Sequence, residues 1–496
     1  MRVLLPLPVV LPLFAAGLSM AVARRRAIQR AIGVITLTAT TAASVAILVG
    51  VDRDGPAAAF MGGWEAPVGI SLAADRLTGL MLVVASPVLL AVLVFATGQH
   101  GTEQEQPAFH PVYLVLAAGV GLSFLTGDLF NLFVAFEMML TASYVLITIG
   151  GRADQVRTGM TYVVINLIAS ALLVATVGLL YAATGTVNMA DLAVRMDGLP
   201  EGVRLAFALL LFVVFGIKAA VFPLFFWLPD SYPTAPTAVT AVFAGLLTKV
   251  GVYCIIRTQT LLFAPEDRPA GFILVIAGLT MVVGVLGAIA QNDIKRILSF
   301  HIVSQIGYMI LGLGLYTVAG VAAAILYVMN QIVLKSTLLL VGGLVDHSAG
   351  SSRLAEVGGI ARRFPVLGWL FLLPALSLAG VPPFSGFVAK LGVVQAGFDA
   401  GAWVVVGASL AVSVLTLYSM TKIWGGAFWG EPQVVTEPTD ALTARHGGTA
   451  PMLAATAALV VGSLVLAVLA GPLFELCQRA AADLLEPSAY IDAVLA

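Results

Sequence analysis

Long apolar runs, separated by short polar breaks, recur along the whole sequence. Each run is near the roughly 20 residues that an α-helix needs to cross about 30 Å of hydrocarbon. Fourteen runs can be distinguished, and the least distinct breaks are Gly127–Asp128 and the one between Thr317 and Gly320. The runs span residues 3–21, 28–49, 70–97, 112–127, 129–150, 159–183, 204–226, 238–261, 271–290, 299–317, 320–345, 365–396, 404–425 and 452–472. The sequence therefore predicts an all-α polytopic membrane protein of about fourteen transmembrane helices.

Charged residues are too few to cover a water-soluble surface. Asp, Glu, Lys and Arg make up 10% of the 496 residues, whereas soluble domains carry about 25%. This composition excludes a soluble enzyme, and the net charge of −1, which offers no basic field for phosphates, excludes a nucleic-acid binder. The two cysteines, Cys254 and Cys477, lie on or near apolar runs, so neither a disulfide framework nor a thiolate metal site is expected.

The basic residues of the breaks predict an orientation. The cluster Arg24, Arg25, Arg26 and Arg30 follows the first run, whose amino-terminal side holds only Arg2. This charge order favours a retained first helix with its amino terminus outside over a cleaved signal peptide. Alternating from there, thirteen basic residues fall on the cytoplasmic side and eight, Arg257 among them, fall on the external side. Both termini are therefore predicted to be external.

Five ionisable residues lie inside the predicted spans: Lys218, Lys249, Lys335, Lys390 and Glu137. A lysine at mid-bilayer costs roughly 2.5–3.5 kcal/mol on insertion scales, so such groups are candidates for function. Burial removes the solvation that favours the ammonium form, so a buried lysine can pick up and release a proton near neutral pH. If Glu137 pairs with Lys218, it favours the ammonium, and moving the carboxylate away would release the proton.

His301, in SFHIVSQIGYM, could join these groups through water into a proton relay. Plainer interpretations remain open. Lys249 and Lys335 are each within two or three turns of a helix end and could snorkel to the interface, and His301 could hydrogen-bond a carbonyl at a helix start. No phosphate loop, nucleophile elbow or zinc motif occurs in the sequence, so no cofactor, metal site or enzymatic activity is predicted.

Prolines interrupt two of the lysine-bearing runs, the seventh and the twelfth. A proline frees a carbonyl, which is tolerated in a membrane where the backbone lines a wet cavity or is shielded by neighbouring helices. Such unwound segments in corresponding positions of two halves indicate an ion path in an inverted-repeat transporter. The predicted hinges are Pro223, Pro229, Pro382 and Pro383.

The two interrupted helices are five spans apart, which predicts a repeat. Helices four to eight and nine to thirteen would each form a five-helix unit, and an odd number of crossings inverts the second unit relative to the first. No strong residue identity links the two units, so this prediction rests on proline placement and helix counting. The predicted organisation is helices one to three at residues 1–110, a first unit at 111–262, an inverted second unit at 270–425, and a loop with a final helix at 426–496.

Several segments together resemble one family. KAAVFPLFFWLPDSYPTAPTAVTAVFAGLLTKVGVY, from Lys218 to Tyr253, is similar to the core motif of the antiporter-like membrane subunits shared by respiratory complex I and the multi-subunit Mrp sodium/proton antiporters. FEMMLTASY, NDIKRILSFHIVSQIGYM, NQIVLKSTLLLVGG and GVPPFSGFVAK resemble the remaining motifs in the same order, so the resemblance covers roughly residues 65–430. It implies fourteen helices, two inverted repeats and a central hydrophilic axis. The matching positions are Glu137, Lys218, Lys249, His301, Lys335 and Lys390.

Details within the family favour the D-type subunit of the Mrp antiporters. They are GLLTKVGVY around Lys249, SFHIVSQIGYM with Gln305, and KIWGGAFWGE; the M-type subunit of complex I has His in place of Gln305 and Glu in place of Lys390. The resemblance implies a subunit that moves protons along the axis, coupled to sodium extrusion, together with other Mrp subunits in the lipid bilayer of a prokaryotic cell membrane.

Two alternatives stay open. One is a proton-pumping subunit of complex I or of a membrane-bound hydrogenase. The other is an assembly subunit with a degenerate relay, against which Glu137 and the four lysines argue.

Overall fold

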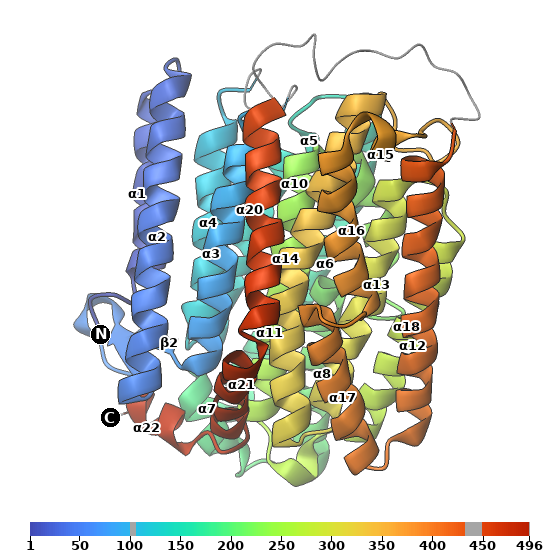
Figure 1. Ribbon diagram of the computed structural model, residues 1–496. Helices are drawn as coiled ribbons and strands as arrows, with labels where there is room; N and C mark the ends of the chain where they lie inside the picture. Colours follow the sequence, from blue (N-terminus) through green and yellow to red (C-terminus); the bar gives the residue numbers. More distant parts are fainter. Residues whose placement is uncertain (100–105, 432–448, 496) are drawn as a thin grey trace.

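The computed structural model describes residues 1–99, 106–431 and 449–495 as a bundle of long helices (Figure 1). Both chain ends lie toward the same end of the bundle, the lower one in Figure 1, beside strand β2 and helix α7. We call this end the terminal face and the other end the opposite face. A chain that crosses the bundle an even number of times has both termini at the same face.

Within the described residues, eleven helical segments are long and apolar enough to cross a membrane, and three shorter apolar helices accompany them. The eleven are α2 (Arg26–Asp54), α3 (Arg76–Ala96), α5 (Leu129–Thr148), α6 (Ala153–Thr184), α8 (Glu201–Ala219), Thr237–Leu261 (α10, Thr237–Val242; η3, Phe243–Leu247; α11, Thr248–Leu261), α12 (Ala270–Ile289), α13 (Ile294–Gly314), α14 (Val318–Ala349), Trp403–Trp429 (α18, Trp403–Ile423; η5, Trp424–Trp429) and α20 (Thr449–Val468). The three are α1 (Leu7–Ala21), α4 (Phe109–Leu125) and α16 (Pro365–Ala379). These segments coincide with the fourteen predicted runs.

Short elements complete the described fold. They are β1 (Ala57–Phe60), η1 (Met61–Gly63), β2 (Ser71–Ala74), α7 (Met189–Met196), α9 (Trp227–Ser231), η2 (Tyr232–Thr234), η4 (Pro265–Asp267), α15 (Ile360–Arg363), α17 (Ser385–Asp399), α21 (Ala470–Leu485) and α22 (Ser488–Leu495). The strands form one antiparallel hairpin that pairs Ala57 with Ala74. The described part of the protein is therefore helical apart from this hairpin at the terminal face.

The two least distinct breaks are marked by capping side chains. Asp128 precedes α5, and its Oδ1 accepts a hydrogen bond from the Asn131 backbone N–H at 2.7 Å. Thr317 precedes α14, and its Oγ1 accepts from the Gly320 N–H at 3.1 Å. Such caps satisfy backbone donors that a helix start leaves unpaired. Both breaks are confirmed as helix boundaries.

Helices α8 and α16 end inside the bundle in the same way. In each, the second residue beyond the helix donates its N–H to a carbonyl five residues back, and the residue before it adopts a positive φ. This is the Schellman arrangement, which satisfies carbonyls at a helix end. The donor–acceptor pairs are Val221–Gly216 and Ala220–Ile217 in the first unit, and Val381–Leu376 and Gly380–Ser377 in the second. The two sets are separated by the same number of residues along the chain.

The earlier parts of the two units also correspond. Here each residue of the first unit matches the residue of the second unit at the same sequence separation as Gly185 and Gly350. Helices α6 and α14 both have 32 residues, and each ends at one of these glycines, which adopt a positive φ. Isolated antiparallel bridges pair Asp128 with Asn188, and Asp293 with Arg353. Both aspartates also cap the following helix. The backbone therefore repeats in the way that proline placement predicted.

The matching bridges lie at opposite ends of the bundle. Asn188 directly precedes α7 at the terminal face, whereas Arg353 leads into α15 at the opposite face (Figure 1). This placement is the one that an inverted second unit produces. Helix α14 and the segment Thr237–Leu261 are buried along their length, so the core of the bundle lies where the two units meet.

The carboxyl-terminal part differs from the prediction of one final helix at 452–472. Helix α20 ends at Val468, and α21 and α22 continue along the terminal face. Asp483 of α21 contacts the Arg76 guanidinium at 2.6 Å, and the Tyr490 ring of α22 lies 4.9 Å from the Arg257 guanidinium. Residues 432–448 of the predicted loop lie outside the described residues.

Candidate functional site

All four lysines singled out in the spans lie in the protein interior. Their relative exposures range from 0% for Lys335 to 5% for Lys390. Lys249 and Lys335 therefore do not snorkel to an interface. A buried ammonium needs hydrogen-bonding or charged partners, and the structure places each lysine in a different polar environment.

Lys218 is the penultimate residue of α8 and points at α6. Its Nζ donates to the Asn166 carbonyl at 3.2 Å, the Asn166 Oδ1 at 3.5 Å and the Ser170 Oγ at 3.2 Å. The ammonium also lies 5.4 Å from the centre of the Phe136 ring. Three oxygens and a π-face surround the charge, so the broken helix presents its amine to a prepared acceptor site on α6.

Glu137 does not form the direct ion pair with Lys218 that the sequence left open. Among the described residues no carboxylate lies within 4 Å of Lys218, although Glu137 is within electrostatic range of it. The Glu137 Oε1 is buried and lacks a hydrogen-bond partner in this part of the chain. Phe136, the neighbour of Glu137, provides the ring against Lys218. The carboxylate therefore acts on the ammonium through space.

A π-helical turn precedes Lys249. In η3 the backbone departs from α-helical hydrogen bonding, and π-turns inside helices occur often at functional sites. The Lys249 Nζ donates to the Ala244 carbonyl of this turn at 2.6 Å and to the Thr248 Oγ1 at 3.3 Å. Gly251 brings this helix against the end of α8, where an added Cβ would lie 2.6 Å from the Ala219 nitrogen. The backbones at Lys218 and Lys249 are thus close, but their amines have separate partners.

Lys335 and His301 carry unpaired polar atoms. The Lys335 Nζ and the His301 Nδ1 are buried without hydrogen-bond partners in the described ranges, while the His301 Nε2 lies 2.8 Å from the Ser419 Oγ. Lys335 is within electrostatic range of Lys249 and Lys390, and His301 is within range of Lys335 and Lys390. These four residues form one group at the junction of α11, α13, α14 and α17.

Lys390 lies beside the second helix break. Its Nζ donates to the carbonyl of Ala379, the last residue of α16, and to the Ser413 Oγ, both at 3.2 Å. The Tyr308 ring centre lies 4.9 Å from the ammonium. Gly380 is required here, because its φ is +86° and a Cβ would approach the Lys390 Cδ to 2.8 Å. The carbonyl at the broken helix end thus accepts a hydrogen bond from a lysine.

The predicted hinge prolines occupy different places. Pro223 lies in the non-helical stretch after α8, and Pro382 and Pro383 lie between α16 and α17. Pro229 is inside the short helix α9 and does not lie at the break. Sequence reasoning also missed the polar partners Asn166, Ser170, Tyr308, Ser413 and Ser419, which are ordinary residues in apolar helices and become partners of the charged groups only after packing.

A second feature that the sequence missed is a buried ion pair at the terminal face. Arg257, which charge counting assigned to an external break, lies in α11 and contacts both oxygens of Asp75, at 2.6 and 2.7 Å. Burial raises the pKa of Asp75, but the charge and hydrogen bonds of Arg257 outweigh this effect and hold its pKa below the ordinary value. Asp75 also caps α3 by accepting from the Thr78 N–H.

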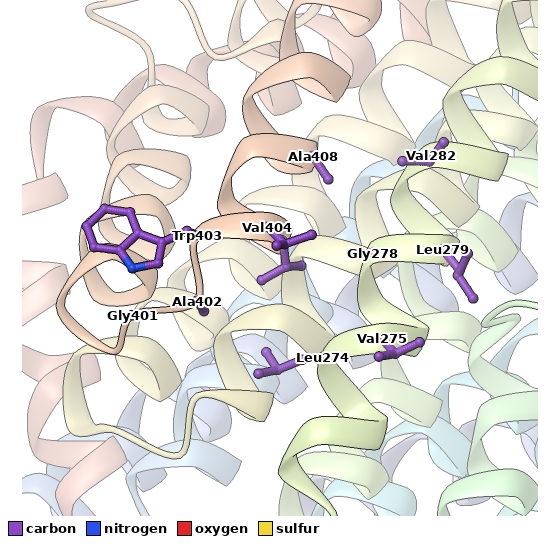
Figure 2. A pocket seen from close by; sticks show the side chains of 11 residues that line it. Leu274, Val275, Gly278, Leu279, Val282, Gly401, Ala402, Trp403, Val404 and Ala408 are labelled. Atoms are coloured by element: carbon purple, nitrogen blue, oxygen red, sulfur yellow. The ribbon is translucent and has the colours of Figure 1, made fainter.

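An apolar groove of about 510 Å³ lies apart from the lysines, between α12 and the start of α18. Figure 2 shows Leu274, Val275, Leu279 and Val404 lining it, together with Trp403. Its lining offers no charged group for an ion. The buried amines, amides and hydroxyls of the two units lie elsewhere, in the bundle interior.

A fourteen-span bundle with two inverted broken helices and buried amines at their junction defines a membrane-embedded ion-transport subunit. The family model described as "NADH:quinone oxidoreductase/Mrp antiporter, TM" matches residues 126–416. The D subunit of the Na(+)/H(+) antiporter of Alkalihalophilus pseudofirmus is 42% identical, with 100% of both chains covered. The chain belongs to the family of NADH:quinone oxidoreductase and Mrp antiporter membrane subunits.

Solved structures agree with this assignment. A chain in the structure of the Mrp complex from a Dietzia species superposes with a TM-score of 0.92 at 35% identity, covering 100% of both chains. A chain of the membrane-bound sulfane sulfur reductase, described as an archaeal respiratory membrane complex, gives a TM-score of 0.89 at 25% identity, again with 100% coverage of both. The same architecture thus occurs in an Mrp complex and in a respiratory complex.

Proposed function

We propose that this chain is the D-type member of a hetero-oligomeric Mrp sodium/proton antiporter and that it carries the proton. The observation that carries the proposal is the line of buried amines between the two broken helices, in a chain that matches such a protein along its full length at 42% identity. The other Mrp subunits are its expected partners, the bacterial cell membrane its location, and both termini are expected outside.

The contacts suggest how protons move. In the first unit, Lys218 holds its charge against Asn166 and Ser170, and Glu137 modulates it through space. At the junction, Lys335 lies within range of both Lys249 and Lys390, so protonation of one amine disfavours protonation of its neighbour. A proton arriving at one amine therefore promotes release from another, which is what stepwise translocation requires.

The test is sodium/proton antiport by the complete complex in everted vesicles. Lys218→Ala and Glu137→Gln are expected to lower antiport strongly while assembly stays normal. Arg296→Gln removes an exposed cation that pairs with Asp230 at the opposite face and serves as the control. Near-normal antiport in an assembled Lys218→Ala complex would contradict the assignment.

The likeness to a respiratory complex makes a redox-driven subunit the second candidate. The two differ in their source of energy. Antiport driven only by an imposed ion gradient, in vesicles without an electron donor, supports the antiporter. Proton movement that requires an electron donor supports the redox-driven subunit instead.

A further inference from the structure

The internal repeat identifies a buried amide in the second unit that none of the predicted site residues includes. At the offset that relates Gly185 of the first unit to Gly350 of the second, Asn166 corresponds to Gln331 and Ser170 corresponds to Lys335. Asn166 and Ser170 are the acceptors of the Lys218 ammonium. The second unit therefore has an amide and an amine where the first unit has an amide and a hydroxyl.

The broken helices differ in a complementary way. At the offset that relates Val221 to Val381 at the two helix ends, Lys218 corresponds to Leu378. No ammonium can therefore reach α14 from this position of α16 as Lys218 reaches α6 from α8. The second unit has its amine on the long helix instead, one turn beyond Gln331.

Gln331 is fully buried, and neither of its side-chain polar atoms has a hydrogen bond of normal geometry among the described residues. The Tyr327 hydroxyl, one turn earlier, lies close enough to interact with the Gln331 amide, but it donates to the Gln305 Oε1. A buried amide that lacks full hydrogen bonding destabilises the fold. Water is the molecule that can satisfy both a donor and an acceptor in such a place.

Gln331 lies in the middle of a polar stripe on α14. Tyr327, Gln331 and Lys335 are spaced four residues apart and so share one helix face. Helical side chains lean toward the amino-terminal turn, so the Lys335 side chain extends toward Gln331. At the other end of the stripe, the ring of Tyr327 lies 5.4 Å from that of Tyr308, which in turn faces the Lys390 ammonium.

We propose that Gln331 holds the water through which protons pass between Lys335 and Lys390. This inference rests on the proposed function. The Lys335 ammonium gives a proton to the water. The water gives a proton to the Lys390 amine, on the side lined by the Tyr327 and Tyr308 rings, and this amine becomes the ammonium. Nothing is oxidised or reduced, and Gln331 itself gains no proton. His301 with Ser419 offers the competing branch.

The experiment compares Gln331→Leu with Lys218→Ala in the complete complex, by antiport in everted vesicles. Gln331→Leu keeps the side-chain volume but removes the amide, and it should lower antiport roughly tenfold, less than the ~100-fold that a proton-carrying side chain contributes. Gln259→Leu is the matched control, because Gln259 is also a fully buried amide with one unpaired atom but lies near the terminal face, on α11. It should retain the rate.

Gln331→Glu tests whether this position lies close enough to Lys335 to act on its proton. A carboxylate next to Lys335 favours its ammonium form, so the pH profile of antiport should shift to higher pH while most of the activity remains. The titratable groups that surround this position are Lys335 and Tyr327 on α14, His301 and Tyr308 on α13, Lys249 on α11 and Lys390 on α17.

The outcomes separate this inference from the proposed function. A Gln331→Leu complex with normal rate and pH profile overturns the inference if Lys218→Ala is inactive, and leaves the proposed function standing. An active Lys218→Ala complex overturns the proposed function. If Gln331→Leu fails to assemble, an unchanged pH profile in Gln331→Glu overturns the inference and a shifted one supports it.

Discussion

The two five-helix units share a backbone but place their charges differently. Each has a helix that ends in a Schellman arrangement and a long helix of 32 residues. In the first unit the broken helix brings the amine, Lys218, to acceptors on the long helix; in the second, Leu378 takes the position of Lys218 and the amine is Lys335 on the long helix. The repeated fold thus provides a junction for an amine, and side chains decide which helix supplies it.

The last helices of the two units give the largest expected difference in stability. Arg257 of α11 is bound to buried Asp75, whereas Lys422 of α18 donates to the carbonyls of Ile289 and Gln291. Arg257→Met should cost about 3–5 kcal/mol because it leaves a buried charge unpaired. Lys422→Met should cost about 1.5 kcal/mol, since its carbonyl acceptors carry no charge. Thermal unfolding of the purified complex, monitored by the thiol labelling of buried Cys254, measures the loss of stability in both variants.

Substitutions at the equivalent positions of the two broken helices should differ in their effect on antiport. Lys218→Ala should lower antiport roughly 100-fold, and Lys218→Arg should do the same because arginine does not release its proton. Leu378→Met, the volume-matched change at the corresponding position, should leave the rate within about twofold, since volume-conserving apolar changes are tolerated. A strong loss of antiport in an assembled Leu378→Met complex would mean that α16 contributes more than a backbone break.

An exchange tests whether the junction accepts an amine from either helix. Lys335→Ser alone should lower antiport roughly 100-fold, because it removes a proton-carrying side chain. Adding Leu378→Lys gives the second unit the arrangement of the first, and we expect it to recover part of the loss. If the double variant assembles and is no better than Lys335→Ser, the two units are alike in backbone only.

The helix ends themselves should respond differently to small changes. Gly380→Ala places a methyl group at φ +86° and against Lys390, and should cost about 1–2 kcal/mol. Ala220 already occupies the left-handed region at φ +60°, so Ala220→Gly should change stability by less than about 1 kcal/mol. The same thiol-labelling measurement compares the two, and equal effects would show that Lys390 plays no part in the difference.

Acid should weaken the first unit more than the second. The pKa of Asp75 is lowered in the folded protein, so its ion pair stabilises the fold above the ordinary pKa near 4 and this contribution is lost as the pH falls through the lower folded value. The carbonyl partners of Lys422 do not titrate. Thermal unfolding of the purified complex, compared between about pH 6 and pH 3, should show an acid-dependent loss of stability that is absent from Asp75→Asn.

Much of the fold followed from sequence patterns because membrane spans are local. Apolar runs near the length of the bilayer located the fourteen segments, and the breaks before Leu129 and Val318 proved to be capped helix starts. Proline placement located both interrupted helices. The amphipathic helices α21 and α22 were missed, because they lie along the terminal face and lack the apolar length by which spans are recognised.

The site was only partly predictable. Five of the six predicted residues of the axis are buried and Glu137 is half-buried. Glu137 and Lys218 do not form an ion pair, and Arg257, which charge counting placed on the external side, is buried. Asn166, Ser170 and Gln331 carry no signal in one sequence, because a single amide or hydroxyl in an apolar helix is unremarkable until a charged neighbour packs against it.

Local sequence patterns were sufficient to predict the membrane environment, about fourteen spans and the placement of five ionisable residues inside them, because these properties depend on hydrophobicity along the chain. Helix packing was needed to establish which amine meets which acceptor, and that the two units repeat in backbone and not in chemistry. Hydrogen bonds act over a few ångströms, and Lys218 is separated from its partners Asn166 and Ser170 by 48 to 52 positions, so these contacts exist only once the helices have packed.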